Sequence, residues 1–187
     1  MPLNPGDPWL VVVDMQAVFG DPASPWAAPD FAAASTVTLD LVARFAPRVV
    51  LTRFVAPAEP RGAWMSYYEQ FPFALVPDDD PLYALAPGFT GTPFPVLTLP
   101  TFGKWGPELR ALVGEAPIVV CGVSTDCCVL STVLAAADAG VAVTVVADAC
   151  AGATAVDHDR ALAAMRLYTP LVDVVSADDV RRSLFRH

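Results

Sequence analysis

Six short, continuous and β-branched apolar runs constrain the fold of this chain more than any other feature of its sequence. They cover Trp9–Val13, Val49–Phe54, Val96–Leu99, Ile118–Cys121, Val141–Val146 and Leu171–Val175. Runs of this kind are typical of parallel strands that are buried on both faces. Helical patterns lie between them, at Asp30–Phe45, about Trp105–Val113, Thr125–Ala139, Ala155–Leu167 and Ala177–Phe185. The alternation predicts a three-layer α/β/α fold around a mainly parallel six-stranded sheet with right-handed crossovers.

The stretch from Val55 to Pro95 interrupts this alternation. It is rich in proline, holds the acidic run Asp78–Asp80, and carries the aromatic residues Trp64, Tyr67, Tyr68, Phe71 and Phe73. A long insertion inside a compact domain usually has a function of its own. The chain has 187 residues, the usual size of one domain. We therefore expect a single domain over residues 1–187, with a lid or subunit arm at about residues 55–95.

The composition indicates where such a chain works. Hydrophobic residues make up 55% of it, yet no run reaches the roughly 18 uncharged apolar residues of a membrane-spanning helix. The start "MPLNPGDPWL" has no basic segment followed by an apolar stretch, so we expect no signal peptide. We predict a cytoplasmic protein that buries its surplus apolar surface in a homo-oligomer, either a dimer or a tetramer.

Charge and motifs narrow the class of ligand. The formal net charge of −9 repels a phosphate backbone, which argues against a nucleic-acid partner. The sequence has no GxGxxG or GxxxxGK[ST] phosphate loop. Its four cysteines and two histidines lack the spacing of a zinc site. We therefore expect a small-molecule substrate, with no cofactor, no metal and no membrane partner.

Polar side chains follow the predicted strands at their carboxyl ends, where open parallel sheets bind ligands. Asp14 follows the first strand, and Arg53 lies at the end of the second. Thr98 and Lys104 lie at or after the end of the third. The segment "GVSTDCC" follows the fourth strand, and Asp148 follows the fifth. A carboxylate, a cation and a thiol should therefore converge on one edge of the sheet.

The adjacent cysteines of that segment, Cys127 and Cys128, follow a predicted helix start. Ser124, Thr125 and Asp126 are all favourable capping residues. Both thiols would lie in the first turn, where free N–H groups and the helix dipole lower a thiol pKa. The two residues would point about 100° apart, so at most one could face a pocket. Because free cysteines are also common in cores, these local features leave a nucleophile and simple packing equally open.

Two segments carry a resemblance to a known family. They are "WLVVVDMQAVF" near the start and "VVCGVSTDCCVLSTVLAAADAGVAVTVVADAC" in the second half. Both are similar to the isochorismatase-like cysteine hydrolases, a group that includes nicotinamidases and N-carbamoylsarcosine amidase. The resemblance covers nearly the whole chain except the insertion, and the block G-[VL]-x-T-D-x-C-V is specific to the family. It implies a Rossmann-like arrangement of the sheet.

The resemblance also implies a Cys–Asp–Lys triad. Cys128, the cysteine directly before the valine of the block, would be the nucleophile, and Cys127 would occupy a variable position. Asp14, in the "VDMQ" motif, would take the thiol proton and pass it to the leaving amine. The family further implies a cis peptide bond at Val123–Ser124. The backbone N–H groups of Ser124 and Cys128 would then form an oxyanion hole.

The triad lysine is where the sequence departs from the family pattern. Counting back from Leu109 by the family's spacing leads to Thr98, which is not a lysine. Lys104 lies six residues later and is the only lysine of the chain. An intact triad therefore requires Lys104 to supply the cation, with Arg53 as the second candidate.

A second departure concerns the chemistry. The histidines that nicotinamidases carry after the second strand are absent from "TRFVAPAEPRGAW", which disfavours a zinc site and nicotinamide as the substrate. The resemblance then implies a cofactor-independent hydrolase that cleaves an amide or ureide-type C–N bond of a small molecule through a thioester. Two alternatives stay open. One is a non-catalytic homologue that binds a small molecule or a partner, and the other is a hydrolase of ester or vinyl-ether bonds.

Residues that contact the substrate are harder to assign. The candidates are Gln16, Phe19, Trp64, Tyr68 and Trp105, with Phe102 as a further aromatic wall. Core packing is an equal alternative for each aromatic residue, and Gln16 could instead brace Asp14. We expect Asp126 and Asp148 to cap helices or brace loops, and His158 to take no part in the chemistry.

Overall fold

A six-stranded parallel sheet forms the centre of the fold. The computed structural model describes residues 6–184. Its strands are β1 (Trp9–Val13), β2 (Val49–Phe54), β3 (Val96–Leu99), β4 (Ile118–Val123), β5 (Val143–Ala151) and β6 (Val172–Val175). They lie in the order β3-β2-β1-β4-β5-β6, and every neighbouring pair is parallel. The chain order reverses between β1 and β4, and such a switch point is where doubly wound sheets bind ligands.

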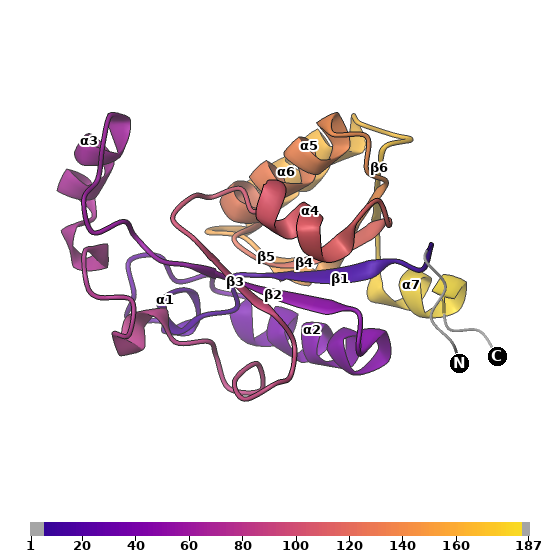
Figure 1. The fold of residues 1–187 in the computed structure, drawn as a ribbon, viewed down its shortest axis with the longest axis horizontal. Coiled ribbons are helices and arrows are strands. Elements are labelled where there is room, and N and C mark those ends of the chain that lie inside the picture. The colour runs from indigo at the N-terminus through magenta and orange to yellow at the C-terminus, as the bar shows by residue number, and fades with distance from the viewer. Residues whose placement is uncertain (1–5, 185–187) are drawn as a thin grey trace.

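Helices cover both faces of the sheet and complete the three layers that the sequence predicts (Figure 1). One face carries α4 (Pro107–Val113), α5 (Leu130–Asp138) and α6 (Ala155–Arg166), and the other carries α1 (Ala17–Gly20), α2 (Phe31–Phe45) and α7 (Ala177–Leu184). Local chemistry sets several of their starts. Pro107 opens α4, where its missing N–H costs nothing. The Thr154 hydroxyl accepts the N–H of Asp157 and caps α6.

The helix predicted from Thr125 begins differently from the prediction. Its first turn is a π-turn, η3 (Thr125–Val129), and the α-helical part starts only at Leu130. The N–H groups of Cys127 and Val129 both donate to the carbonyl oxygen of Ser124, each at 3.1 Å. Such widened turns occur mostly at functional sites.

Strand β5 also runs further than the apolar pattern indicates. Asp148 therefore lies inside β5, whereas the sequence places it after the strand. Its Oδ1 accepts the N–H of Ala177 at 2.7 Å, so this carboxylate caps α7 as expected of a bracing residue. Phe185, the predicted last residue of that helix, lies outside the described residues.

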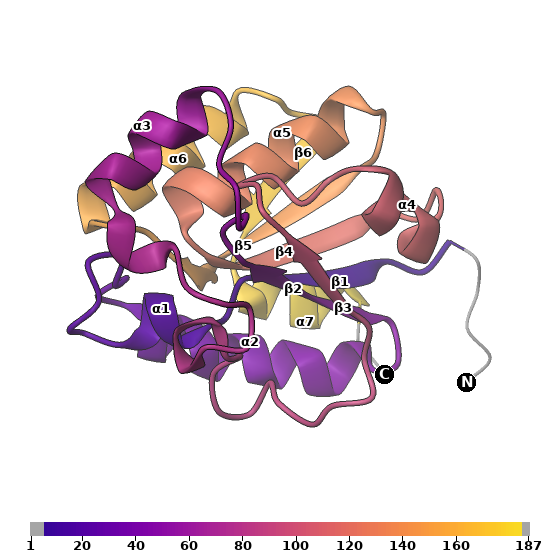
Figure 2. The same cartoon turned by 60° about the vertical axis from the view of Figure 1, so that its left-hand side comes forward.

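The insertion contains structure of its own. It folds into α3 (Ala63–Gln70) and two short 3₁₀ turns, η1 (Pro72–Ala74) and η2 (Pro81–Tyr83). Figures 1 and 2 show α3 standing away from α1 and α2, on the side of the sheet that carries α5 and α6. We call residues 57–82 the arm. The arm stands beyond the carboxyl ends of the strands, where it can wall a site.

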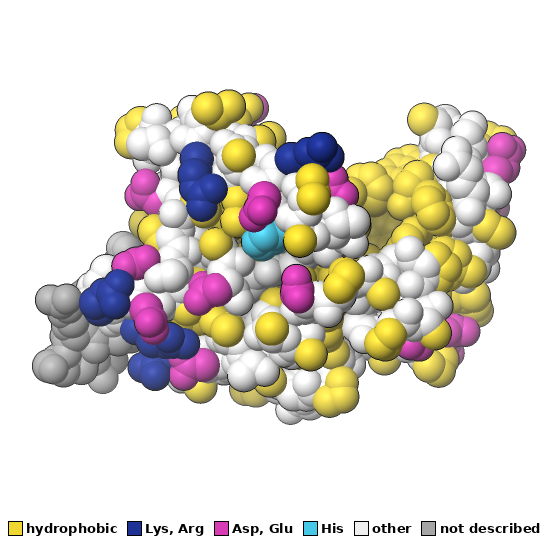
Figure 3. Space-filling view, turned by 180° about the vertical axis from the view of Figure 1, so that it is seen from behind, with side chains coloured by type: hydrophobic (Ala, Val, Ile, Leu, Met, Phe, Trp, Pro, Cys, Tyr) yellow, Lys and Arg dark blue, Asp and Glu magenta, His cyan; other side chains and the backbone are white. Residues whose placement is uncertain are grey.

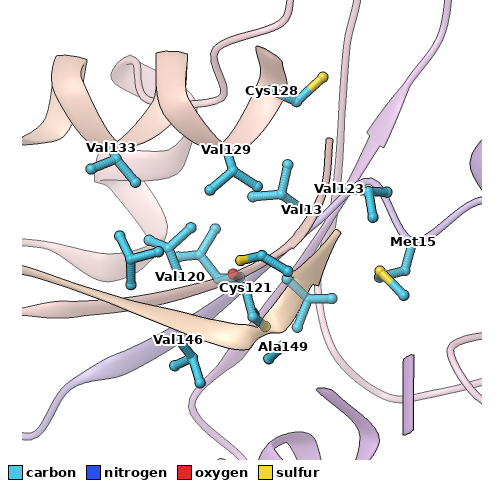
Figure 4. Close-up of a cluster of buried hydrophobic side chains, with 14 of the residues drawn as sticks. Val13, Met15, Val120, Cys121, Val123, Cys128, Val129, Val133, Val146 and Ala149 are labelled. Atoms are coloured by element: carbon cyan, nitrogen blue, oxygen red, sulfur yellow. Dashed lines mark hydrogen bonds between the residues drawn. The ribbon is translucent and has the colours of Figure 1, made fainter. Parts of the chain in front are cut away.

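The core beneath this edge is dense and apolar (Figure 4). Val13, Val120, Val123, Val133 and Val146 are all at most 1% exposed. Full burial of a valine side chain stabilises a fold by about 1.5–3 kcal/mol. Figure 4 places Cys121 inside this cluster and Cys128 at its upper rim, so only one of the two is positioned for chemistry. No helix among residues 6–184 is both long enough and apolar enough to cross a membrane.

Candidate active site

Strands β1 and β4 approach closely at their carboxyl ends because β4 carries a glycine there. A Cβ at Gly122 would lie 2.1 Å from the carbonyl oxygen of Val13, which leaves no room for a side chain. The φ angle of Gly122 is +112°, a value that other residues rarely adopt. The approach brings Asp14, the residue after β1, close enough to the Cys128 thiol on the turn after β4 for each group to shift the pKa of the other.

Asp14 is fully buried, and Thr52 of β2 fixes its orientation. The Thr52 hydroxyl donates to Asp14 Oδ1 at 2.6 Å and accepts the Asp14 N–H at 3.1 Å. The φ angle of Asp14 is +49°, the only positive φ at a non-glycine position among residues 6–184. Such a conformation costs about 1–3 kcal/mol and persists where the surroundings over-determine it. The fold therefore holds this carboxylate in a single, strained position.

Lys104 supplies the cation beside Asp14. Its Nζ lies 3.0 Å from Asp14 Oδ2, and both side chains are 0% exposed. The ammonium also donates to the carbonyl oxygen of Thr101 at 2.6 Å and lies 5.2 Å from the centroid of the Phe54 ring. These contacts compensate a charge that would be very costly to bury alone. The displaced lysine thus reaches the carboxylate, as an intact triad requires.

A single threonine ties the lysine loop to the turn that carries the thiol. The Lys104 N–H donates to Thr132 Oγ1 at 2.9 Å, and the Thr132 hydroxyl donates to the Cys128 carbonyl oxygen at 2.6 Å. The second cation candidate is engaged elsewhere, since Arg53 Nη2 donates to the carbonyl oxygen of Asp78 at 2.6 Å. Thr98 lies in β3 opposite Arg53.

Cys128 is 3% exposed and lies in η3. Burial raises the pKa of its thiol well above the usual value, and the charge of Asp14 raises it further. The charge of Lys104 and the backbone N–H of Ser124 act in the opposite direction. The prediction that the helix start lowers this pKa is therefore wrong, because burial and the neighbouring carboxylate outweigh the turn's N–H groups.

The pKa of Asp14 moves in the same direction as that of the thiol. Burial raises the pKa of the Asp14 carboxyl, while the charge of Lys104 and the hydroxyl of Thr52 hold it down. The Cys128 thiol and the Asp14 carboxyl are both buried, and each influences the pKa of the other. Asp14 is therefore placed as the proton acceptor beside the sulfur.

The loop around Ser124 is braced by Asp126, as the sequence predicts for that carboxylate. Asp126 Oδ1 accepts the Ser124 hydroxyl at 2.5 Å and the Ala153 N–H at 2.9 Å. The Val123–Ser124 peptide bond, where the resemblance implies a cis bond, is cis. Behind the loop, the hydroxyl of Thr125 hydrogen-bonds His158 Nδ1 at 2.9 Å, which gives this histidine a structural partner.

A cavity of about 170 Å³ opens beside the thiol. Its lining residues are Phe19, Pro25, Trp26, Ala27, Phe54, Tyr67, Phe102, Ser124, Asp126, Cys127, Cys128 and Ala153. Figure 3 shows a hollow with hydrophobic walls between the body of the molecule and a projecting part of it. A cavity of this size has room for a small substrate.

Cys127 also lines this cavity, but its thiol is poorly suited to attack. Its Sγ donates to Asp126 Oδ2 at 3.7 Å. Burial and then the charge of Asp126 raise the pKa of Cys127 to about 11. The two adjacent cysteines therefore differ in their neighbours: Cys128 has Asp14 and Lys104, whereas Cys127 has a carboxylate alone.

The structure places only some of the predicted substrate contacts at the cavity. Phe19 and Phe102 line the cavity. Trp64 and Tyr68 form a second row, in which Trp64 packs against the Phe102 ring at 5.1 Å and stacks on Tyr68 at 5.9 Å. Trp105 packs against the hydrophobic core and is not among the lining residues.

Gln16 is a brace and not a substrate contact. Its Nε2 donates to the carbonyl oxygens of Phe54 and Tyr83, both at 2.9 Å. Its Oε1 accepts the Phe54 N–H at 2.7 Å. The amide is fully buried, and both of its N–H groups are occupied by backbone carbonyl oxygens, so neither is left to donate to a ligand. Instead it joins β1 and β2 to Tyr83, the residue that directly follows the arm.

Three aromatic walls of the cavity were missed from the sequence: Trp26, Phe54 and Tyr67. Phe54 ends a predicted strand and could have been found by its place at the carboxyl edge. Tyr67 lies next to the candidate Tyr68, and only the phase of α3 distinguishes them. Trp26 lies in a segment with no periodic pattern, so no sequence signal indicates it. Among residues 6–184 no cluster of three or more His, Cys, Asp or Glu side chains could hold a metal ion.

Comparisons with known proteins found a matching family model and a curated relative. The family model described as "Isochorismatase domain" matches residues 8–179. A curated protein of Xenopus laevis, "Isochorismatase domain-containing protein 2", is 41% identical over 78 residues, which are 42% of this chain. The match spans 36% of the length of that relative.

Solved structures show the same fold at low sequence identity. A cysteine hydrolase from Pseudomonas syringae pv. phaseolicola 1448A superposes with a TM-score of 0.80 at 21% identity, over 97% of this chain and 94% of that one. A structure described as a putative MAR1 ribonuclease from Leishmania major gives 0.69 at 18% identity, over 94% and 81% of the two chains.

Proposed function

We propose that this chain, which belongs to the isochorismatase family of hydrolases, cleaves an amide or ureide-type C–N bond of a small molecule through a thioester on Cys128. One observation carries the proposal: Asp14 and Lys104 form a buried ion pair 3.0 Å apart, and the charge of each acts on the neighbouring Cys128 thiol. A thiol, a proton acceptor and a cation beside one another are the parts that thiol-mediated acyl transfer needs.

In the first step, the substrate carbonyl lies against the turn after β4. Cys128 Sγ attacks the carbonyl carbon while its proton passes to Asp14. The backbone N–H groups of Ser124 and Cys128 then receive the oxyanion of the tetrahedral intermediate. Burial raises the pKa of the Asp14 carboxyl, which makes its carboxylate a stronger base for this transfer than an exposed one.

In the second step, Asp14 returns the proton to the leaving nitrogen. The C–N bond breaks, ammonia or an amine departs, and the acyl group stays on sulfur as a thioester. Water then attacks the thioester, with Asp14 again taking the proton. The C–S bond breaks, the carboxylic acid leaves, and the proton returns to sulfur. Lys104 keeps Asp14 oriented and balances its charge whenever the carboxylate is ionised.

The alternatives are distinguished by what they require of the thiol. A binding-only homologue does not need a buried carboxylate and cation in contact, and these groups are costly to bury without a role. A vinyl-ether hydrolase would not need the thiol. An esterase would use the same thioester and differ only in its leaving group.

The test compares Cys128→Ala with Cys127→Ala, its matched control, on a panel of small amides, ureas and esters. We expect Cys128→Ala to lose at least about 10³-fold in kcat/KM, and Cys127→Ala to stay within about threefold of the parent. Rapid acid quenching and mass spectrometry of the parent should show an acyl adduct on the peptide that carries Cys128. Unchanged turnover in Cys128→Ala would refute the thioester route, and turnover confined to esters would reassign the bond cleaved.

A further inference from the structure

The wall of the cavity and the charges at its rim restrict which substrates it accepts. Five aromatic rings line it, and they pack on one another. Phe19 and Trp26 are stacked with ring centroids 6.2 Å apart and planes 13° from parallel. Trp26 also meets Phe54 edge-on at 5.7 Å, and Tyr67 meets Phe102 edge-on at 5.7 Å. Rings that restrain one another make a rigid, flat-sided slot, which favours a planar and apolar group.

Among residues 6–184, no lysine or arginine lines the cavity. Lys104, beneath it, is fully buried, paired with Asp14 and bonded to the Thr101 carbonyl oxygen. Arg53 is bonded to the Asp78 carbonyl oxygen and is not a lining residue. A carboxylate on the substrate would therefore lose its hydration without gaining a cation in return, which is unfavourable in an apolar pocket.

Asp126 is the one charged side chain among the described residues of the wall, and its charge has the same sign as such a substrate. Its Oδ1 accepts hydrogen bonds from the Ser124 hydroxyl and the Ala153 N–H, and its Oδ2 accepts the Cys127 thiol. These contacts fix the carboxylate within the wall. Because Asp126 and Cys128 line the same cavity, an anionic substrate at Cys128 would share that cavity with a like charge, which repels it.

We infer that the site takes a small uncharged carboxamide with a planar apolar or aromatic group, and that Asp126 makes it reject anionic analogues. This inference rests on the proposed function, since it places the amide carbonyl at Cys128. It deepens that function by naming the class of substrate and the residue that sets the selection.

Binding to Cys128→Ala tests the inference without turnover. The probes are benzamide and the pair fumaramide and fumaramate, which are planar, nearly equal in shape, and differ by one negative charge. Isothermal titration should show benzamide and fumaramide binding, with fumaramate weaker than fumaramide by about 30-fold or more. Cyclohexanecarboxamide, whose ring is not flat, should bind at least about fivefold more weakly than benzamide. Equal binding of fumaramide and fumaramate, or failure of both neutral planar amides to bind, would overturn the inference.

The role of Asp126 is tested in the same background with Asp126→Asn. Asparagine keeps the Oδ1 acceptor for Ser124 and Ala153 and removes the charge. We expect the preference for fumaramide over fumaramate to fall at least fivefold. Asp138→Asn, on the exposed end of α5, changes the net charge equally and should leave the preference unchanged. If both variants reduce it equally, or neither does, Asp126 is not the selecting residue.

These outcomes are separable from failure of the proposed function. If the parent enzyme hydrolyses no amide while Cys128→Ala binds the neutral probes and rejects fumaramate, the thioester mechanism fails and the selection stands. If the parent hydrolyses fumaramide and fumaramate with equal kcat/KM, the mechanism stands and the selection fails.

Discussion

Removing the Thr52 hydroxyl should impair Asp14 without touching the thiol or the cavity. Thr52→Val keeps the shape of the side chain but deletes the donor to Asp14 Oδ1 at 2.6 Å and the acceptor of the Asp14 N–H at 3.1 Å. A hydrogen bond to a charged group contributes about 1.5–3 kcal/mol, and a buried N–H left without a partner costs about 1–3 kcal/mol. With partial relaxation, we expect the free energy of unfolding to fall by about 2–4 kcal/mol.

The same loss should shift the pH dependence of catalysis in a defined direction. The Thr52 hydroxyl stabilises the ionised form of Asp14 and lowers its pKa, so its removal raises that pKa. Asp14 must be ionised to take the thiol proton, and more of it would then be protonated at a given pH. At about 1.36 kcal/mol for each pH unit, the acidic limb of kcat/KM should move up by about one unit. The rate should therefore fall more on the acidic limb than on the plateau of the profile.

Thr52→Ser is the matched control, because serine retains the hydroxyl. Urea unfolding and the pH profile of kcat/KM should both lie close to those of the parent for Thr52→Ser and depart for Thr52→Val. The limb reports the coupled ionisation of Asp14 and Cys128 rather than that of one residue. If the limbs of the two variants coincide, Thr52 does not position or tune the carboxylate, and our account of that contact is wrong.

Three further changes test other parts of the site. Gly122→Ala should cost at least about 3 kcal/mol of stability in urea unfolding, because its Cβ would overlap the Val13 carbonyl and its φ of +112° is unfavourable for alanine. Lys104→Met should lower kcat/KM at least about 10²-fold and destabilise the chain by about 3–5 kcal/mol, since it leaves Asp14 as an unpaired buried charge. If Lys104→Met lowers the free energy of unfolding by less than about 1 kcal/mol, Asp14 is neutral and not an ionised partner of Lys104. Alkylation by iodoacetamide, mapped by mass spectrometry at rising pH, should modify Cys127 only as the pH approaches its pKa of about 11. Rapid modification at pH 7 would contradict that value.

The sheet could be predicted from sequence because its signal is local. Runs such as Val49–Phe54 are apolar throughout, and burial on both faces needs nothing more to be recognised. The end of β5 was missed for the same reason. Asp148 breaks the apolar pattern, and only the start of α7, nearly thirty residues later, supplies the N–H that lets a carboxylate sit in that strand.

The site was predictable in its parts and not in its assembly. Asp14 and Cys128 follow strands directly, so topology alone brings them to one edge. Lys104 lies on an irregular loop, and its position depends on the hydroxyl of Thr132, far along the chain. The error over the thiol pKa has a similar origin. A sequence pattern shows the helix start but not how deeply Cys128 is buried beside a carboxylate.

The Gln16 brace has a consequence for how enzymes of this design diversify. The buried amide of Gln16 joins the end of β1 to the backbone of β2 and to Tyr83, the residue directly after the arm. Asp14 and Thr52 hydrogen-bond each other through the sheet and make none of these bonds to the arm. The arm contributes Tyr67 to the cavity wall, whereas Asp14 and Cys128 follow strands of the sheet. We therefore expect that a change in the arm can alter this part of the wall while the reacting groups keep their places.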